Sequence, residues 1–76
     1  MRVVEITREP VELYKILKFE SLVATGGEAK QVIAAGQVRV NGEVETRKRK
    51  KIVSGDTIEF DRDRIRIQLQ ETGKTK

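Results

Sequence analysis

A run of five basic residues is the part of this sequence best suited to bind another molecule. Arg47-Lys48-Arg49-Lys50-Lys51 places five cations in succession. Residues 36–51 hold six basic side chains, Arg39 among them, against two acidic ones, whereas residues 1–35 and 52–76 each hold five of either sign. The whole net charge of +4 therefore falls in one segment. This concentration is typical of a surface that binds a polyanion.

The basic run has two interpretations. Five like charges are often a solvated, disordered block. Here, however, the run lies between two strand-like segments, which would hold its ends in place, and we favour phosphate binding. If the run is an extended strand, alternation sends Arg47, Arg49 and Lys51 to one face and Lys48 and Lys50 to the other.

Catalytic chemistry has little support in this sequence. The chain contains no histidine and no cysteine, which removes the usual general base, the commonest metal ligand and any thiol nucleophile. Asp61 and Asp63 could suggest a metal pair, but two carboxylates flanked by arginines in a short segment are more typical of a turn. We therefore expect no enzyme activity, no cofactor and no metal site.

Two helices are expected in the first half of the chain. Pro10 is tolerated in a first helical turn, and the apolar residues that follow it predict a helix over residues 10–18. Thr25 and Glu28 form a capping box, so a second helix is expected from there to Ala35. Its buried stripe is Ala29, Val32 and Ile33, and Lys30 points away from this stripe.

Gly26 and Gly27 are unusual at the start of the second helix, because glycine costs about 0.5–1 kcal/mol in a helix relative to alanine. Their bare amides could meet a phosphate at the helix N-terminus. Alternatively, the loop before the helix requires positive φ there, and we slightly favour this second explanation.

The remaining elements are strands. Residues 3–6 predict a first strand, and Asn41-Gly42 between alternating apolar residues predicts a hairpin with a type I′ turn. Further strands are expected at residues 57–60 and 65–69, on either side of a turn. The fold class is α+β, two helices packed beside a small, mostly antiparallel sheet of four to five strands. We expect one domain over residues 1–70 and a polar, disordered C-terminal tail.

Aromatic residues are scarce, and this bears on the kind of nucleic acid expected. Tyr14, Phe19 and Phe60 are the only ones. We place both phenylalanines in the core, which leaves too few rings to stack the bases of a single strand. Structured RNA read by shape and backbone is then the more plausible polyanion.

Several motifs together resemble a known RNA-binding family. They are Ala29-Lys30, Ile33 and Gly36 on the second helix, then Val38-x-Val40-Asn41-Gly42, then Gly55-Asp56. This order is similar to that of the domain named after small-subunit ribosomal protein S-four, also called the αL motif. The resemblance covers about residues 11–60. It departs from the family at Gly26-Gly27, where a Ser-Arg pair is usual.

The resemblance implies a function and a binding face. In this family the second helix and the following hairpin form the RNA face, which here implicates Lys30 and Arg39 with the basic run. The family accompanies ribosomal proteins, tRNA synthetases and pseudouridine synthases, and it includes stand-alone bacterial proteins of about this length. We expect a cytoplasmic, ribosome-associated monomer in translation that binds ribosomal or transfer RNA and no membrane. The alternative is a protein-interaction module that pairs through the hairpin edge, with the basic run only solubilising it.

Overall fold

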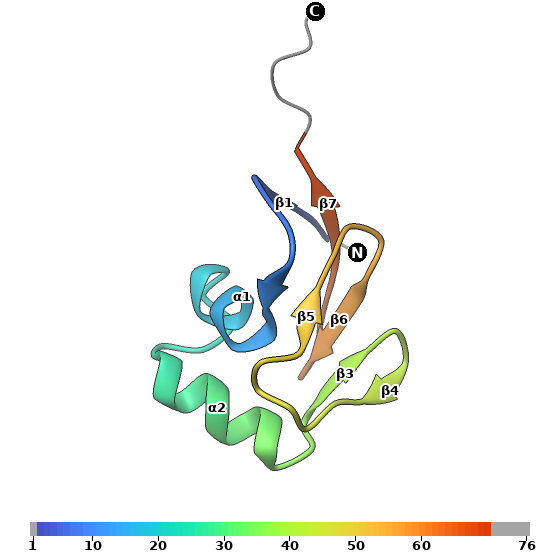
Figure 1. The fold of residues 1–76 in the computed structure, drawn as a ribbon. Helices are drawn as coiled ribbons and strands as arrows, with labels where there is room; N and C mark the ends of the chain where they lie inside the picture. The colour runs from blue at the N-terminus through green and yellow to red at the C-terminus, as the bar shows by residue number, and fades with distance from the viewer. Residues whose placement is uncertain (1, 71–76) are drawn as a thin grey trace, which may run out of the picture.

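The computed structural model describes residues 2–70 and shows two helices against one side of a sheet (Figure 1). Strand β1 spans Arg2–Ile6, β2 Val11–Glu12, helix α1 Leu13–Phe19, helix α2 Gly26–Ala34, β3 Val38–Val40, β4 Glu43–Val44, β5 Lys51–Ile52, β6 Thr57–Phe60 and β7 Asp63–Leu69. The expected tail at residues 71–76 lies outside the described residues. Neither described helix has the length and apolar character needed to cross a membrane.

The main sheet has five strands in the order β1-β7-β6-β3-β4. Strand β1 runs parallel to β7, and the other neighbours are antiparallel. The α+β class and the mostly antiparallel sheet are therefore confirmed. The short strands β2 and β5 form a separate two-stranded sheet that the sequence did not predict.

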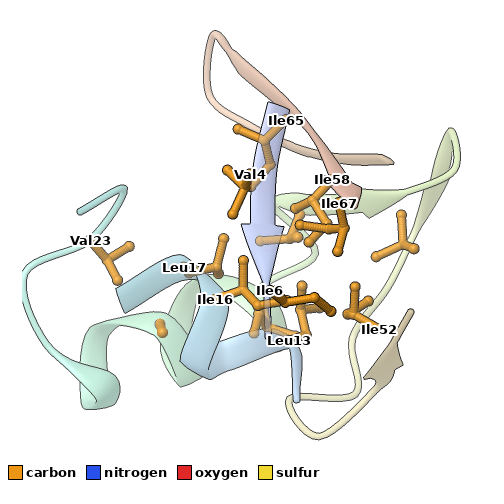
Figure 2. Close-up of a cluster of buried hydrophobic side chains, with 14 residues drawn as sticks. Val4, Ile6, Leu13, Ile16, Leu17, Val23, Ile52, Ile58, Ile65 and Ile67 are labelled. Carbon is orange, nitrogen blue, oxygen red and sulfur yellow. The ribbon is translucent and has the colours of Figure 1, made fainter. Parts of the chain in front are cut away.

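The core lies between the helices and the inner face of the sheet (Figure 2). Alternation along the strands supplies one half of it, because Val38 and Val40 on β3 are buried while Arg39 between them is exposed. The helices supply the other half. The buried apolar side chains are Val4, Ile6, Leu13, Ile16, Leu17, Val23, Ala29, Ile33, Val38, Val40, Ile52, Ile58, Ile65 and Ile67.

Helix α2 begins and ends as its sequence predicts. Thr25 Oγ1 accepts a hydrogen bond from the Glu28 amide at 3.0 Å, as a cap should. The Glu28 carboxylate accepts from the Ala24 amide at 2.9 Å, one residue earlier than in the standard capping box. At the other end Gly36 takes a φ of 78°, the left-handed conformation that favours glycine.

Helix α1 begins later than predicted. It starts at Leu13, whereas Pro10 was expected in its first turn. Val11 and Glu12 instead pair with Ile52 and Lys51 as strand β2, so the segment after the proline is extended. This pairing brings the end of the basic run to the N-terminus of α1.

Phe19 is the clearest error in the predicted core. Its side chain is 67 % exposed at the end of α1, whereas Phe60 packs against the core and is partly buried. The helix already buries Leu13, Ile16 and Leu17 on its inner face. Because a short helix has only one such face, Phe19 projects away from it.

Candidate nucleic-acid interface

The basic run, residues 47–51, is a turn rather than an extended strand, and we call it the basic turn. The Lys50 amide donates to the Arg47 carbonyl at 3.2 Å, and only Lys51 belongs to a strand. The β2–β5 ladder contains two residue pairs and begins at Lys51. Among residues 2–70 no ladder extends the segment before Lys51, so the extended-strand alternative, with its alternating faces, is wrong.

The backbone of the basic turn is fixed by helix α1. The Leu13 amide donates to the Lys50 carbonyl at 2.9 Å, and the Tyr14 amide donates to the Lys48 carbonyl at 3.1 Å. These are first-turn amides that have no acceptor inside the helix. The side chain of Glu12, the N-cap residue, caps neither. The basic turn therefore takes the place of a capping side chain, and in return α1 holds its backbone in position.

Arg47 is neutralised by its neighbour Glu45. Its Nε lies 2.9 Å from Glu45 Oε2 and its Nη2 lies 3.2 Å from Oε1, which is a two-point pair. These hydrogen bonds hold the pKa of the Glu45 carboxyl below its usual value, and they raise the pKa of Arg47. Arg47 therefore adds little net charge to the basic turn.

Three lysines carry the positive charge of the basic turn. Arg49 lies 3.8 Å from a Glu12 carboxylate oxygen, an ion pair at the long end of the range. Lys48, Lys50 and Lys51 form no ion pair with any residue in the range 2–70. Their ammonium groups are the ones free to meet an external anion.

Helix α2 and the basic turn together line an open groove of about 630 Å³, which we call the basic groove. In Figure 1 the segment that joins β4 to β5 passes beside α2. Lys30 and Ala34, one helical turn apart, form the α2 wall. The structure therefore brings Lys30 and the basic run to one groove. The other groove-lining residues are Thr46, Arg47, Lys48, Arg49, Lys50 and Lys51.

Tyr14 supports Lys30 and was missed by the sequence analysis. The Lys30 ammonium lies 4.9 Å from the centre of the Tyr14 ring, within the range of a cation–π contact. Tyr14 lies in the first turn of α1 and donates its amide to the basic turn, so one residue connects the two walls of the groove. No sequence signal links Tyr14 to Lys30, because the contact depends on how the two helices pack.

Arg39 does not reach the basic groove. It lies on β3 between two buried valines, and its side chain therefore points to the sheet face opposite the core. Its Nη1 donates to the Gly42 carbonyl at 3.5 Å. Arg39 is therefore exposed and is not among the residues that line the basic groove.

Gly26 and Gly27 are in the first turn of α2, and neither has positive φ. The explanation from loop geometry is therefore wrong. A Cβ at Gly26 would meet nothing within 4 Å, and one at Gly27 would lie 3.8 Å from Thr25 Oγ1. Gly26 lines a second hollow beside α1, and neither glycine lines the basic groove.

The two aspartates of the Asp61–Asp63 segment lie at a turn between strands. Among residues 2–70, no three acidic side chains come together as ligands for an ion. Asp61 has a φ of 58° and forms the turn between β6 and β7 with Asp63 at the start of the next strand. The turn interpretation of this pair is confirmed.

The fold and these motifs define a domain of the S4 class. The S4 domain family matches residues 4–68, and this chain therefore belongs to that family. The family is an RNA-binding domain rather than a class of enzyme.

Two curated relatives resemble this chain strongly. One is YbcJ of Escherichia coli strain K12, whose name describes it as a candidate RNA-binding protein. The two sequences are 56 % identical over 50 residues, which cover 66 % of this chain and 71 % of the relative. YbcJ of Shigella flexneri matches with the same identity and coverage and is named as uncharacterised.

A solved structure confirms the fold. The solution structure of Escherichia coli YbcJ matches with a TM-score of 0.69 and 43 % identity, covering 90 % of this chain and 87 % of that one. That structure is described as having an αL motif involved in RNA binding. The αL resemblance of the sequence and the αL fold of the structure therefore agree.

Proposed function

We propose that this protein binds structured RNA and that the RNA backbone lies in the basic groove. The observation that carries the proposal is the convergence of Lys30 on α2 with the three unpaired lysines of the basic turn around one groove. Lysines without an internal carboxylate partner attract phosphates and release counterions from the RNA. The family and the YbcJ relatives support RNA as the polyanion.

This surface favours recognition of the shape and backbone of an RNA rather than of its base sequence. The groove side chains are mostly lysines and arginines, which position a protein on phosphates without reading bases. A-form duplexes are recognised in this way, through phosphates and sugar hydroxyls. The groove does not include Arg39 or the amides of Gly26 and Gly27. Any contact of these groups with RNA would be additional to the contacts made in the groove.

Ribosomal and transfer RNA are the targets that we propose, since S-four-like domains accompany proteins that act on both. A monomer in the cytoplasm would meet both RNAs during translation. The test is to crosslink RNA to the protein in its native cells and to sequence it. We expect enrichment of structured segments of one of these RNAs, with loss of that enrichment in a Lys48→Gln, Lys50→Gln, Lys51→Gln variant. Equal recovery by the two proteins would contradict the proposal.

Pairing of a partner protein at the hairpin edge has less support. Strand β4 is indeed an edge of the sheet, but it has only two residues, Glu43 and Val44. Short edge strands offer few backbone groups to a partner strand. Binding to RNA weakens strongly with salt, whereas strand pairing does not, and a salt titration separates the two functions.

A further inference from the structure

A second hollow lies beside helix α1 and carries an exposed aromatic ring. Phe19 is 67 % exposed, the largest exposed fraction among the large apolar side chains of the described residues. It lies four residues after Lys15 on α1, which puts the two side chains on one face of the helix. Tyr14, which is partly buried, lies within 6.0 Å of the Lys15 ammonium. Two rings and a lysine therefore gather on the outer surface of α1.

This hollow, which we call the α1 hollow, adjoins the basic groove. It has a volume of about 960 Å³, and its lining includes Tyr14, Lys15, Phe19 and Gly26. Arg49 and Lys51 line both the α1 hollow and the basic groove, so the basic turn forms the boundary between them. An RNA whose phosphates contact the basic turn therefore passes the mouth of the α1 hollow.

The charge of the α1 hollow suits a nucleotide. Five basic residues line it against three acidic ones. Glu20 contacts Arg2, outside the hollow, at 3.8 Å, and Glu12 contacts Lys15 at 3.6 Å and Arg49 at 3.8 Å. Among residues 2–70, this leaves three cations without an ion pair in the lining, Arg8, Lys18 and Lys51, against the one carboxylate of Glu5. The α1 hollow therefore combines an exposed apolar ring with an excess of cations, and an apolar segment of a partner protein would match only the ring. A base with its phosphate matches both features, since bases stack on aromatic rings and phosphates pair with lysines.

We propose that the α1 hollow holds an unpaired nucleotide of the RNA, with its base stacked on Phe19. This inference rests on the proposed function, because the basic groove must first hold the neighbouring backbone. It adds a specificity to that function: the preferred RNA is a helix interrupted by a bulge or ended by a loop, rather than a continuous duplex. The α1 hollow is also within the size range of small-ligand sites, about 300–1,000 Å³.

The test compares two RNA hairpins that differ by one unpaired nucleotide. The first is fully paired in its stem, and the second carries a single bulged fluorescent adenine analogue. Phe19→Leu removes the ring and keeps an apolar side chain, whereas Phe19→Tyr keeps a ring. Both variants should fold normally because Phe19 is exposed, and thermal unfolding checks this.

We expect the wild-type protein to prefer the bulged hairpin and to quench its fluorescence. Phe19→Leu should lose about 5- to 10-fold in affinity for the bulged hairpin, the lower end of measured base-stacking effects, and should keep its affinity for the paired one. Phe19→Tyr should retain the preference. Equal wild-type affinity for the two hairpins would overturn the proposal. An unchanged preference for the bulged hairpin in Phe19→Leu would also overturn it and would indicate that the exposed ring binds a protein partner instead.

The same experiment separates this inference from the proposed function. A Lys48→Gln, Lys50→Gln, Lys51→Gln variant should weaken binding of both hairpins together. If this lysine variant weakens binding of both hairpins while Phe19→Leu changes the affinity for neither hairpin, RNA binding in the basic groove is supported and base stacking in the α1 hollow is refuted. If the lysine variant binds both hairpins as tightly as the wild type, the proposed function itself fails.

Discussion

The side chain of Asn41 is hydrogen-bonded to the side chain of Asp56, with Nδ2 donating to Oδ1 at 3.0 Å. Asn41 Oδ1 also accepts from the Thr57 amide at 2.9 Å. The other Asp56 oxygen accepts from the Val53 amide at 3.0 Å. One pair of side chains therefore joins the Asn-Gly hairpin to the Gly-Asp turn. These two motifs are fifteen residues apart in the chain, and the pair gives a physical reason for their occurring together.

Gly42 should be intolerant of a β-branched residue. It has a φ of 86°, and a Cβ there would meet nothing within 4 Å, so backbone strain is the only cost. We expect Gly42→Val to lower the free energy of unfolding by about 1–3 kcal/mol, measured by denaturant titration. Glu43→Val, one residue later on exposed β4, is the control and should have a small effect. Equal stability of the two variants would refute the turn assignment.

Gly27 should tolerate alanine. Its φ is not positive, and a Cβ would make only an ordinary contact with Thr25. We expect Gly27→Ala to raise the free energy of unfolding by about 0.5 kcal/mol, because alanine loses less backbone freedom in a helix. A fall in stability would show that the glycine has a structural role. RNA affinity measured on the same variant tests whether a ligand approaches this backbone, since a methyl group would then weaken binding.

Lys30 should contribute to RNA affinity through its place in the groove. Lys30→Gln should weaken binding several-fold and leave the helix intact, because Lys30 lies off the buried stripe. The control is Gln31→Glu, which changes the net charge by the same amount. Gln31 is the next residue on the helix, and it is exposed and does not line the groove. Affinities come from titration of a fluorescent RNA hairpin. Equal losses in the two variants would mean that only net charge matters, and circular dichroism checks the fold.

The pair of Glu45 and Arg47 predicts a dependence of stability on pH. The folded-state pKa of Glu45 lies below its unfolded value because Arg47 donates hydrogen bonds to it. Its contribution to stability is therefore complete above the unfolded value, about 4.3, and is lost as the pH falls through the lowered folded value. Unfolding of the wild type and Glu45→Gln should be compared between neutral and acid pH. The difference between them should shrink on acidification, and a constant difference would contradict the pairing.

Local signals predicted the fold better than long-range ones. Thr25 and Glu28 marked the start of α2, and Asn41-Gly42 marked the hairpin, because capping and type I′ turns depend on a few adjacent residues. Pro10 misled the prediction, since a proline is also tolerated directly before an extended segment such as β2, which pairs with β5. That pairing joins segments forty residues apart, and no local pattern reports it.

The sequence suggested most of the residues that line the candidate groove, but not how they are arranged. The charge count identified the basic turn, and the αL resemblance implicated Lys30. Glu45 lies only two residues from Arg47, so the sequence did contain a signal that this arginine is neutralised. The cation–π contact of Lys30 with Tyr14 and the exposure of Phe19 depend on helix packing, which the periodicity of one short helix does not determine.

The salt dependence of RNA binding tests the account most directly. The variant Lys48→Gln, Lys50→Gln, Lys51→Gln removes the three unpaired charges but keeps the carbonyls that accept from α1. The matched control, Glu45→Gln with Arg47→Gln, removes an ion pair without changing the net charge. Each lost phosphate contact should flatten the plot of log affinity against log salt by about 0.7–0.9, so the lysine variant should lose roughly two units of slope. The control should retain nearly the whole slope, and an unchanged slope in the lysine variant would contradict RNA binding in the basic groove.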